Sequence, residues 1–300
     1  MAYHKVNFFF FLSYMVFMTA FMIWEGIGIT PDRYVLVLIL GSLFIHKTRK
    51  FLMDWLPFLF ILISYDFLRS LAGILNSRVH FQEMINFDSW VFGQNPTLFL
   101  QKIFYQTGEI NWYDYMATFF YFLHFALPLS FAFILWLKNR HYFKRFANAL
   151  LILSYAAFIT YVIFPAAPPW LASKDGYLQG VTKILDVTLK SFPERLDLPT
   201  IYTTFNPNEV AALPSLHAGY PLLVLLFALR FFGKKGAFFL PYVLGVWWSI
   251  LYLGEHYFAD IFFGAIYAFA AFYLTNLLFK LWQHSKIRNF LEKFSTFSPF

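Results

Sequence analysis

Two short clusters of polar residues in this apolar chain have the residue types and spacing that acid–base and nucleophilic chemistry requires. His256 and Asp260 are four positions apart at a predicted helix boundary, so both side chains fall on one helix face. An Asp that accepts a hydrogen bond from one imidazole nitrogen fixes the tautomer and leaves the other nitrogen able to attack an electrophile. The same pair is also compatible with a His that only caps a helix end.

The second cluster surrounds His217. Pro214 suits the first turn of a helix, because its missing N–H would be unpaired there in any case. Free backbone N–H groups at this turn, including that of Leu216, would form an anion site together with the Ser215 hydroxyl. His217 would stand beside that site and could donate a proton, although a solvated His in a first helical turn is an equally good interpretation.

Membrane helices must position both clusters. The chain of 300 residues is 60% apolar and only 13% charged, whereas a soluble domain carries about a quarter charged residues. A helix needs about 20 apolar residues to cross a bilayer. The sequence predicts eight such spans, at about 7–27, 34–46, 54–73, 115–137, 147–165, 215–233, 237–254 and 260–281. We therefore predict an all-α polytopic membrane bundle that forms one domain over 1–300, with a catalytic core over about 55–281.

Basic residues predict the orientation of this bundle. Most of the 23 Lys and Arg residues fall in one set of alternating short loops, which the positive-inside rule assigns to the cytoplasm together with both termini. Both polar clusters then lie at the extracytoplasmic ends of helices. The two long outer segments, about 74–114 and 166–214, must lie above the bilayer or against protein, and we expect interfacial helices in the aromatic first one. With no targeting tail or glycosylation site evident, we expect a bacterial or archaeal plasma membrane.

Taken together, the two clusters resemble a known family. The segment 214–219, with the sequence PSLHAG, is followed by HYFAD at 256–260. This combination is similar to the type 2 phosphatidic acid phosphatase superfamily. The PSLH and HYxxD forms are closest to its inositol phosphorylceramide synthase-like branch, as are the stretches FPAAPPW at 164–170 and YDFLR at 65–69.

The resemblance implies a role for each residue of the two clusters. His256 would be the nucleophile of a phospho-histidine intermediate, Asp260 would orient it, and His217 would protonate the leaving group. Residue spacing alone is compatible with these roles but does not decide which His attacks. Ionisable residues at such positions in a membrane protein are candidates for function.

The chain departs from the phosphatase branch of that family. It contains no Arg-Pro pair, and Ser249 and Ile250 stand where that branch carries Ser-Arg. Phosphoryl transfer depends on electrostatic stabilisation, so another cation must neutralise the transferred group. Arg69, three residues after Asp66 at the outer end of a predicted span, is the best candidate, although an Arg there can also simply snorkel to the interface. Weaker substitutes are Arg78, Lys174 and Lys183.

The remaining polar residues and the overall charge indicate no further site. His80, Glu83 and Glu255 receive no role from the sequence. The histidines on inner segments or within a predicted span, among them His124, are interpreted as structural. We expect no metal and no other cofactor, because Asp and Glu do not cluster with His at ligand spacing. The net charge of +7 reflects the basic inner loops, so nucleic acid is not an expected partner.

Three functions are compatible with these residues. A transferase would move a phospho-headgroup from a phospholipid to a hydroxyl acceptor. A hydrolase would use water on a phosphatidate-like or polyprenyl-phosphate substrate, and the two differ only in whether the site excludes water. A transporter or scaffold would need no chemistry, but transporters usually place charges at the bilayer midplane rather than at helix ends. The family resemblance favours the transferase.

Overall fold

The structure is a computed structural model that describes residues 13, 16–21, 24, 48–76, 78–205 and 208–283. Within these ranges the chain is helical, and its only β contacts are two isolated bridges, which join Ala166 to His80 and to Ala211. The predicted all-α class is therefore confirmed for the described part of the chain.

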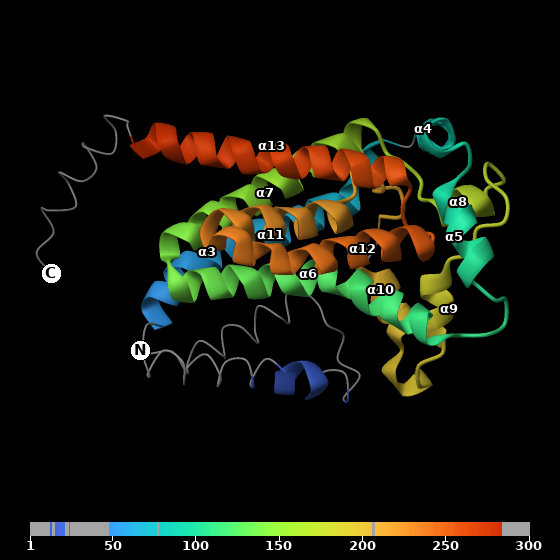
Figure 1. Ribbon diagram of the computed structural model, residues 1–300, viewed down its shortest axis with the longest axis horizontal. Helices are drawn as coiled ribbons and strands as arrows, with labels where there is room; N and C mark the ends of the chain where they lie inside the picture. The colour runs from blue at the N-terminus through green and yellow to red at the C-terminus, as the bar shows by residue number, and fades with distance from the viewer. Residues whose placement is uncertain are drawn as a thin grey trace, which may run out of the picture.

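Six helices run along one common direction and form a bundle (Figure 1). They are α3 (Thr48–Leu75), α6 (Trp112–Lys138), α7 (Arg140–Ile163), α11 (Leu216–Phe232), α12 (Leu240–Tyr252) and α13 (Phe258–Gln283). Helix α11 contacts α6, α7, α12 and α13, so it is the central element of the bundle. A 3-10 segment, η2 (Gly233–Phe239), connects α11 to α12.

Five short helices gather at one end of the bundle, the right-hand end of Figure 1, which we call the capped end. The segment between α3 and α6 supplies α4 (Gln82–Phe92) and α5 (Pro96–Phe104). The segment between α7 and α11 supplies α8 (Pro169–Lys174), α9 (Ile184–Lys190) and α10 (Leu198–Phe205), with a 3-10 turn η1 (Glu194–Leu196) between the last two. These are the two long segments that the sequence places outside the bilayer, and they lie at the same end.

Four helices among the described residues are long and apolar enough to cross a membrane: Lys50–Ser70 within α3, Trp112–Lys138, Arg140–Ile163 and Phe258–Trp282. They confirm the predicted spans at 54–73, 115–137, 147–165 and 260–281. The predictions at 215–233 and 237–254 correspond to α11, of 17 residues, and α12, of 13 residues, which lie in the bundle but are shorter than the about 20 residues of a typical span. The predicted spans at 7–27 and 34–46 lie outside the described residues except for a few positions.

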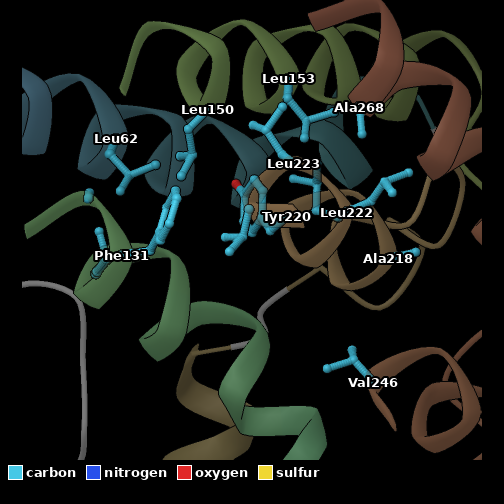
Figure 2. Packing of buried hydrophobic residues seen from close by; sticks show 14 of the residues in the cluster. Leu62, Phe131, Leu150, Leu153, Ala218, Tyr220, Leu222, Leu223, Val246 and Ala268 are labelled. Carbon is cyan, nitrogen blue, oxygen red and sulfur yellow. The ribbon is translucent and has the colours of Figure 1, made fainter. Parts of the chain in front are cut away.

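The interior of the bundle is apolar (Figure 2). Leu223 of α11 is fully buried and belongs to one cluster with Leu153 of α7, Phe131 of α6 and Ala268 of α13. Lipid tails are as apolar as these side chains, so close packing holds helices together in a membrane more than removal from water does. This packing fixes the positions of the helices that carry the two polar clusters.

Two glycines let α11 and α13 approach each other near the capped end. A Cβ atom added to Gly264 of α13 would lie 2.3 Å from the carbonyl oxygen of Ser215, which is closer than any real contact. A Cβ on Gly219 of α11 would lie 3.2 Å from the carbonyl oxygen of Gly264. Small residues at a helix crossing allow such backbone contact. The crossing brings the first turn of α11 against the start of α13.

Candidate active site

His256 and Asp260 contact each other at the start of α13, as their spacing predicts. The Nδ1 atom of His256 lies 3.1 Å from Oδ2 of Asp260. The same carboxylate oxygen accepts the backbone N–H of Tyr257 at 2.9 Å, which fixes its orientation. Because a carboxylate can only accept, Nδ1 of His256 carries the hydrogen and Nε2 keeps its lone pair. Both side chains are buried, so the pair is held away from bulk water.

His217 reaches this pair from α11. Ser215 caps that helix, because its hydroxyl oxygen accepts the N–H of Ala218 at 3.2 Å. The N–H of Ser215 in turn donates to the carbonyl oxygen of Asp260 at 3.0 Å, so the two helix starts are tied together. Nδ1 of His217 then lies 3.0 Å from Nε2 of His256. Residues that are 39 positions apart in the sequence thus form one continuous line of hydrogen bonds.

The order of donors along this line follows from the partners. Asp260 accepts from Nδ1 of His256, so Nε2 of His256 is an acceptor and Nδ1 of His217 must supply the hydrogen between the rings. One imidazole therefore presents a lone pair and the other a proton to the same small space. A group that enters between the two rings would meet a nucleophile on one side and an acid on the other.

A third imidazole, for which the sequence predicts a structural role, lies against His217. The ring centre of His124 on α6 is 3.8 Å from that of His217, and Tyr121, one turn before His124, stacks on His217 at 4.6 Å. Nδ1 of His124 donates to the carbonyl oxygen of Tyr121. His124 follows the start of α6 by 12 positions, or about 18 Å of helix. The paired histidines are therefore recessed into the bundle, and no periodic signal in the sequence predicts this contact.

Asp88 supports the start of α13 from outside the bundle. This fully buried side chain on α4 accepts the backbone N–H groups of Phe258 at 3.0 Å and Ala259 at 2.8 Å. The first N–H groups of a helix have no partner within it, so Asp88 caps α13 from a distance of 170 residues along the chain. Burial raises the pKa of Asp88 to about 7, against the opposing effect of these two N–H donors. No local pattern in the sequence marks Asp88 as a site residue.

Arg69 lies on α3 near the capped end, as predicted. Its guanidinium forms an ion pair with Asp66 at 3.4 Å, and its backbone carbonyl accepts the Nδ2–H of Asn208 at 2.8 Å. Its charge acts on both His217 and His124, so it lies within electrostatic range of the paired histidines. Of the weaker candidates, Arg78 and Lys174 are exposed, whereas Lys183 is largely buried beside Trp170.

The predicted anion site at the start of α11 is present only in part. The Ser215 hydroxyl is fully buried and already serves as the helix cap, so its oxygen is engaged with Ala218. The N–H groups of Leu216 and His217 belong to the first turn of α11, where backbone N–H groups have no partner within the helix. No group of three or more potential metal-ligating side chains occurs among the described residues.

Comparisons with known proteins match both clusters. Residues 82–274 match the profile of the PAP2 superfamily, a range that includes 214–219 and 256–260 but not Arg69. The chain is 29% identical over 301 aligned residues to the phosphoinositol dihydroceramide synthase of Bacteroides thetaiotaomicron, which covers 95% of this chain and 96% of that protein.

Two fungal proteins match a smaller part of the chain. The inositol phosphorylceramide synthase catalytic subunit of Saccharomyces cerevisiae is 29% identical over 153 residues, covering 43% of this chain and 35% of that protein. The inositol phosphorylceramide synthase of Candida albicans is 27% identical over 191 residues, covering 55% of this chain and 38% of that protein. No solved structure matches the chain.

Proposed function

This chain belongs to the PAP2 superfamily, and on that basis we propose that it transfers a phosphoinositol headgroup from a glycerophospholipid to the hydroxyl group of a ceramide-type lipid. The chain is an integral membrane enzyme that acts on lipid phosphates, with four described helices able to span a bilayer. The choice of headgroup and acceptor is supported by the names of the bacterial and fungal relatives.

One observation carries the proposal: Asp260, His256 and His217 form a continuous line through contacts of 3.1 and 3.0 Å. In the first step, Nε2 of His256 attacks the phosphorus atom of the donor lipid. The bond between phosphorus and the diacylglycerol oxygen breaks, and His217 gives its Nδ1 proton to that oxygen. The headgroup phosphate remains on His256 as a phospho-histidine, and Asp260 stabilises the positive charge that develops on the ring.

The second step reverses these roles. The acceptor hydroxyl takes the place of the departed diacylglycerol, and His217, now without its proton, removes the hydroxyl hydrogen. The acceptor oxygen bonds to phosphorus while the phosphorus–nitrogen bond breaks. His256 returns to its neutral form with Nδ1–H on Asp260, and His217 is protonated again, so the enzyme is ready for another donor.

Charge on the transferred phosphate needs stabilisation in both steps, because phosphoryl transfer relies mainly on positioning and electrostatics. We assign this role to Arg69, supported by the N–H groups of Leu216 and His217 at the start of α11. The ion pair with Asp66 would hold the guanidinium in place. The Ser215 hydroxyl would contribute indirectly, by fixing the first turn of α11.

The proposal extends to the arrangement in the membrane. We infer a single domain with eight spans in the plasma membrane of a bacterial or archaeal cell, with both termini in the cytoplasm and the capped end outside. Basic residues at the opposite end support this orientation, since Arg140 and Lys144 there contact the buried Asp54 at 2.5 and 3.8 Å. The covering short helices at the capped end would keep water from the phospho-histidine.

The decisive experiment supplies the protein, reconstituted in lipid, with inositol-labelled phosphatidylinositol and ceramide. We expect label in a new sphingolipid for the wild type and none for His256→Ala, with folding of the variant checked by its melting temperature. Release of water-soluble inositol phosphate without ceramide dependence would instead identify a hydrolase. Equal label transfer by wild type and variant would overturn the nucleophile assignment.

A further inference from the structure

Glu255 is a buried carboxylic acid beside the nucleophile that the proposed mechanism does not use. It directly precedes His256 and is 6% exposed. Its Oε2 atom accepts a hydrogen bond from the Tyr202 hydroxyl at 3.2 Å, whereas its buried Oε1 atom has no hydrogen-bond partner. A buried acceptor without a partner loses its hydrogen bonds to water and gains none in return, which destabilises the folded protein. Such a cost calls for a compensating role.

A chain of tyrosines connects Glu255 with the paired histidines. The Tyr202 hydroxyl lies 3.1 Å from the Tyr121 hydroxyl, and the Tyr121 ring stacks on His217. Tyr202 comes from α10 of the capped end and Tyr121 from α6 of the bundle. The carboxyl of Glu255 therefore lies beside the catalytic space, at the boundary between the short covering helices and the bundle.

The nearby cation does not form the ion pair that would keep Glu255 charged. The Lys183 ammonium forms its ion pair with Asp186, and it lies 4.2 Å from the ring centre of Trp170 and 5.1 Å from that of Tyr202. Burial raises the pKa of Glu255 to about 7, although the charges of Lys183 and His256 oppose the shift. A carboxyl group that exists in both forms near neutral pH can donate to hydroxyl groups or accept from them.

The geometry of the transfer decides which part of the substrate lies at Glu255. Attack and departure occur in line, so His256, phosphorus, the departing oxygen and His217 share one axis. Glu255 adjoins His256 and contacts Tyr202, so it flanks this axis. The group that flanks the axis is the headgroup, which stays on phosphorus through both steps.

We propose that Glu255 and Tyr202 form a subsite that binds the hydroxyl groups of a polyol headgroup. The subsite deepens the proposed function and rests on it. Oε1 of Glu255 accepts one headgroup hydroxyl, and the Tyr202 hydroxyl, which already bonds both Glu255 and Tyr121, bonds a second. A site built to bond hydroxyl groups rejects analogues that lack them, because its buried polar atoms then stay unpaired.

The test compares a donor with a polyol headgroup, phosphatidylinositol, and a donor whose small headgroup carries no free hydroxyl, phosphatidylethanol, both with the same acyl chains. Diacylglycerol release in the presence of ceramide is measured for the wild type, Glu255→Gln, Tyr202→Phe and a matched control, Glu209→Gln, at an exposed position. We expect Glu255→Gln to lower kcat/KM for phosphatidylinositol by roughly 10- to 100-fold, mainly through KM, and to change phosphatidylethanol turnover by less than about 2-fold. Tyr202→Phe should follow with a smaller loss, and Glu209→Gln should match the wild type.

If phosphatidylethanol turnover is too slow to measure, the contribution of Glu255 to headgroup binding can be measured instead. In a His256→Ala background, short-chain phosphatidylinositol should raise the melting temperature, and the added Glu255→Gln change should remove that rise. Equal losses for both donors, or no loss for either, would overturn the subsite. Failure of the proposed function gives a different result from failure of the subsite: the wild type would transfer no inositol label, or His256→Ala would stay active.

Discussion

The bundle interior and the capped end bury different kinds of side chain. Around Leu223 the buried residues are almost all apolar and contact one another mainly through van der Waals packing (Figure 2). Four buried acids lie on elements of the capped end or on the helix starts that adjoin it: Asp88 on α4, Asp114 in the first turn of α6, Glu255 just before α13 and Asp260 in its first turn. At the opposite end, the Asp54 carboxylate is buried against Arg140 and Lys144. Each of the first four acids makes hydrogen bonds to residues from other elements or from the adjoining turn. The structure of the interior thus depends on the complementary shapes of apolar side chains, whereas the structure of the capped end depends on individual polar contacts.

The difference implies that the two regions respond differently to substitution. An apolar core relaxes partly around a truncated side chain and keeps its topology, at a cost in stability. A polar network loses function when one partner changes, because the remaining groups are left buried and unpaired. Tyr252 illustrates the point, since its hydroxyl donates to Asp114, which caps α6 through the N–H of Asn111. Substitutions in the two regions should therefore separate activity from stability.

The largest effect is expected for Asp260→Asn. The amide keeps the shape of the carboxylate, but it removes the charge that stabilises the developing imidazolium and permits the wrong tautomer of His256. We expect kcat for headgroup transfer to fall by about 10³-fold or more, while the melting temperature stays within a few degrees of the wild type. The measurement is label transfer at saturating donor, together with thermal unfolding in the same detergent.

A loss of less than about 10-fold with normal folding would show that the paired histidines work without the carboxylate. A useful control is Asp66→Asn, which is half-exposed on α3 and contacts only the guanidinium of Arg69 among the ion pairs described. We expect this change to weaken transfer by a smaller factor, because Arg69 itself remains.

A second substitution tests the contact that joins the two regions. In Gly264→Ala the added methyl group would lie 2.3 Å from the carbonyl oxygen of Ser215, so α13 must move away from α11. Such a shift separates His256 from His217, and a misplacement of about 1 Å can cost about 10²-fold in rate. Ile266→Ala on the outer face of α13 is the matched control. Equal activity of Gly264→Ala and the control would mean that the helix crossing does not set the distance between the histidines.

The third substitution should affect stability alone. Leu223→Ala removes a fully buried side chain from the centre of the bundle and leaves a cavity. We expect a loss of about 2–5 kcal/mol in unfolding free energy, with transfer activity per folded molecule within about 2-fold of the wild type. Activity is measured below the lowered melting temperature. A specific loss of kcat in the folded variant would contradict the division between the two regions.

The sequence predicts those parts of the molecule that depend on local spacing. Four long spans, the contact of His256 with Asp260 and the capped first turn of α11 all follow from patterns within a few residues. The pairing of His217 with His256 was implied only by the family resemblance and by their common side of the membrane. The structure adds the distance and the order of donors.

Local sequence patterns do not predict contacts between segments that are far apart in the chain. Asp88 lies 170 positions before the N–H groups that it accepts, and it stands in a segment where nothing marks it from neighbouring polar residues. His124 lies inside an apolar run, which favours a structural interpretation, yet its ring is 3.8 Å from that of His217. Both depend on how the helices cross, and single-sequence periodicity carries no information on crossing angles or depth.

The smallest effect is a pH dependence of stability that arises at the capped end. Burial raises the pKa of Asp88 to about 7, whereas an Asp in an unfolded chain has a pKa of about 3.9. The folded protein therefore favours the protonated form: this contribution to stability is complete below about pH 4 and is lost as the pH rises through 7. We expect the melting temperature of the wild type to fall relative to that of Asp88→Asn by roughly 5–10 °C between pH 5 and pH 8. Glu255 titrates in both proteins, so its contribution cancels in the difference. A difference that moves the other way would mean that the two N–H donors of α13 outweigh burial and keep Asp88 ionised as the cap of that helix.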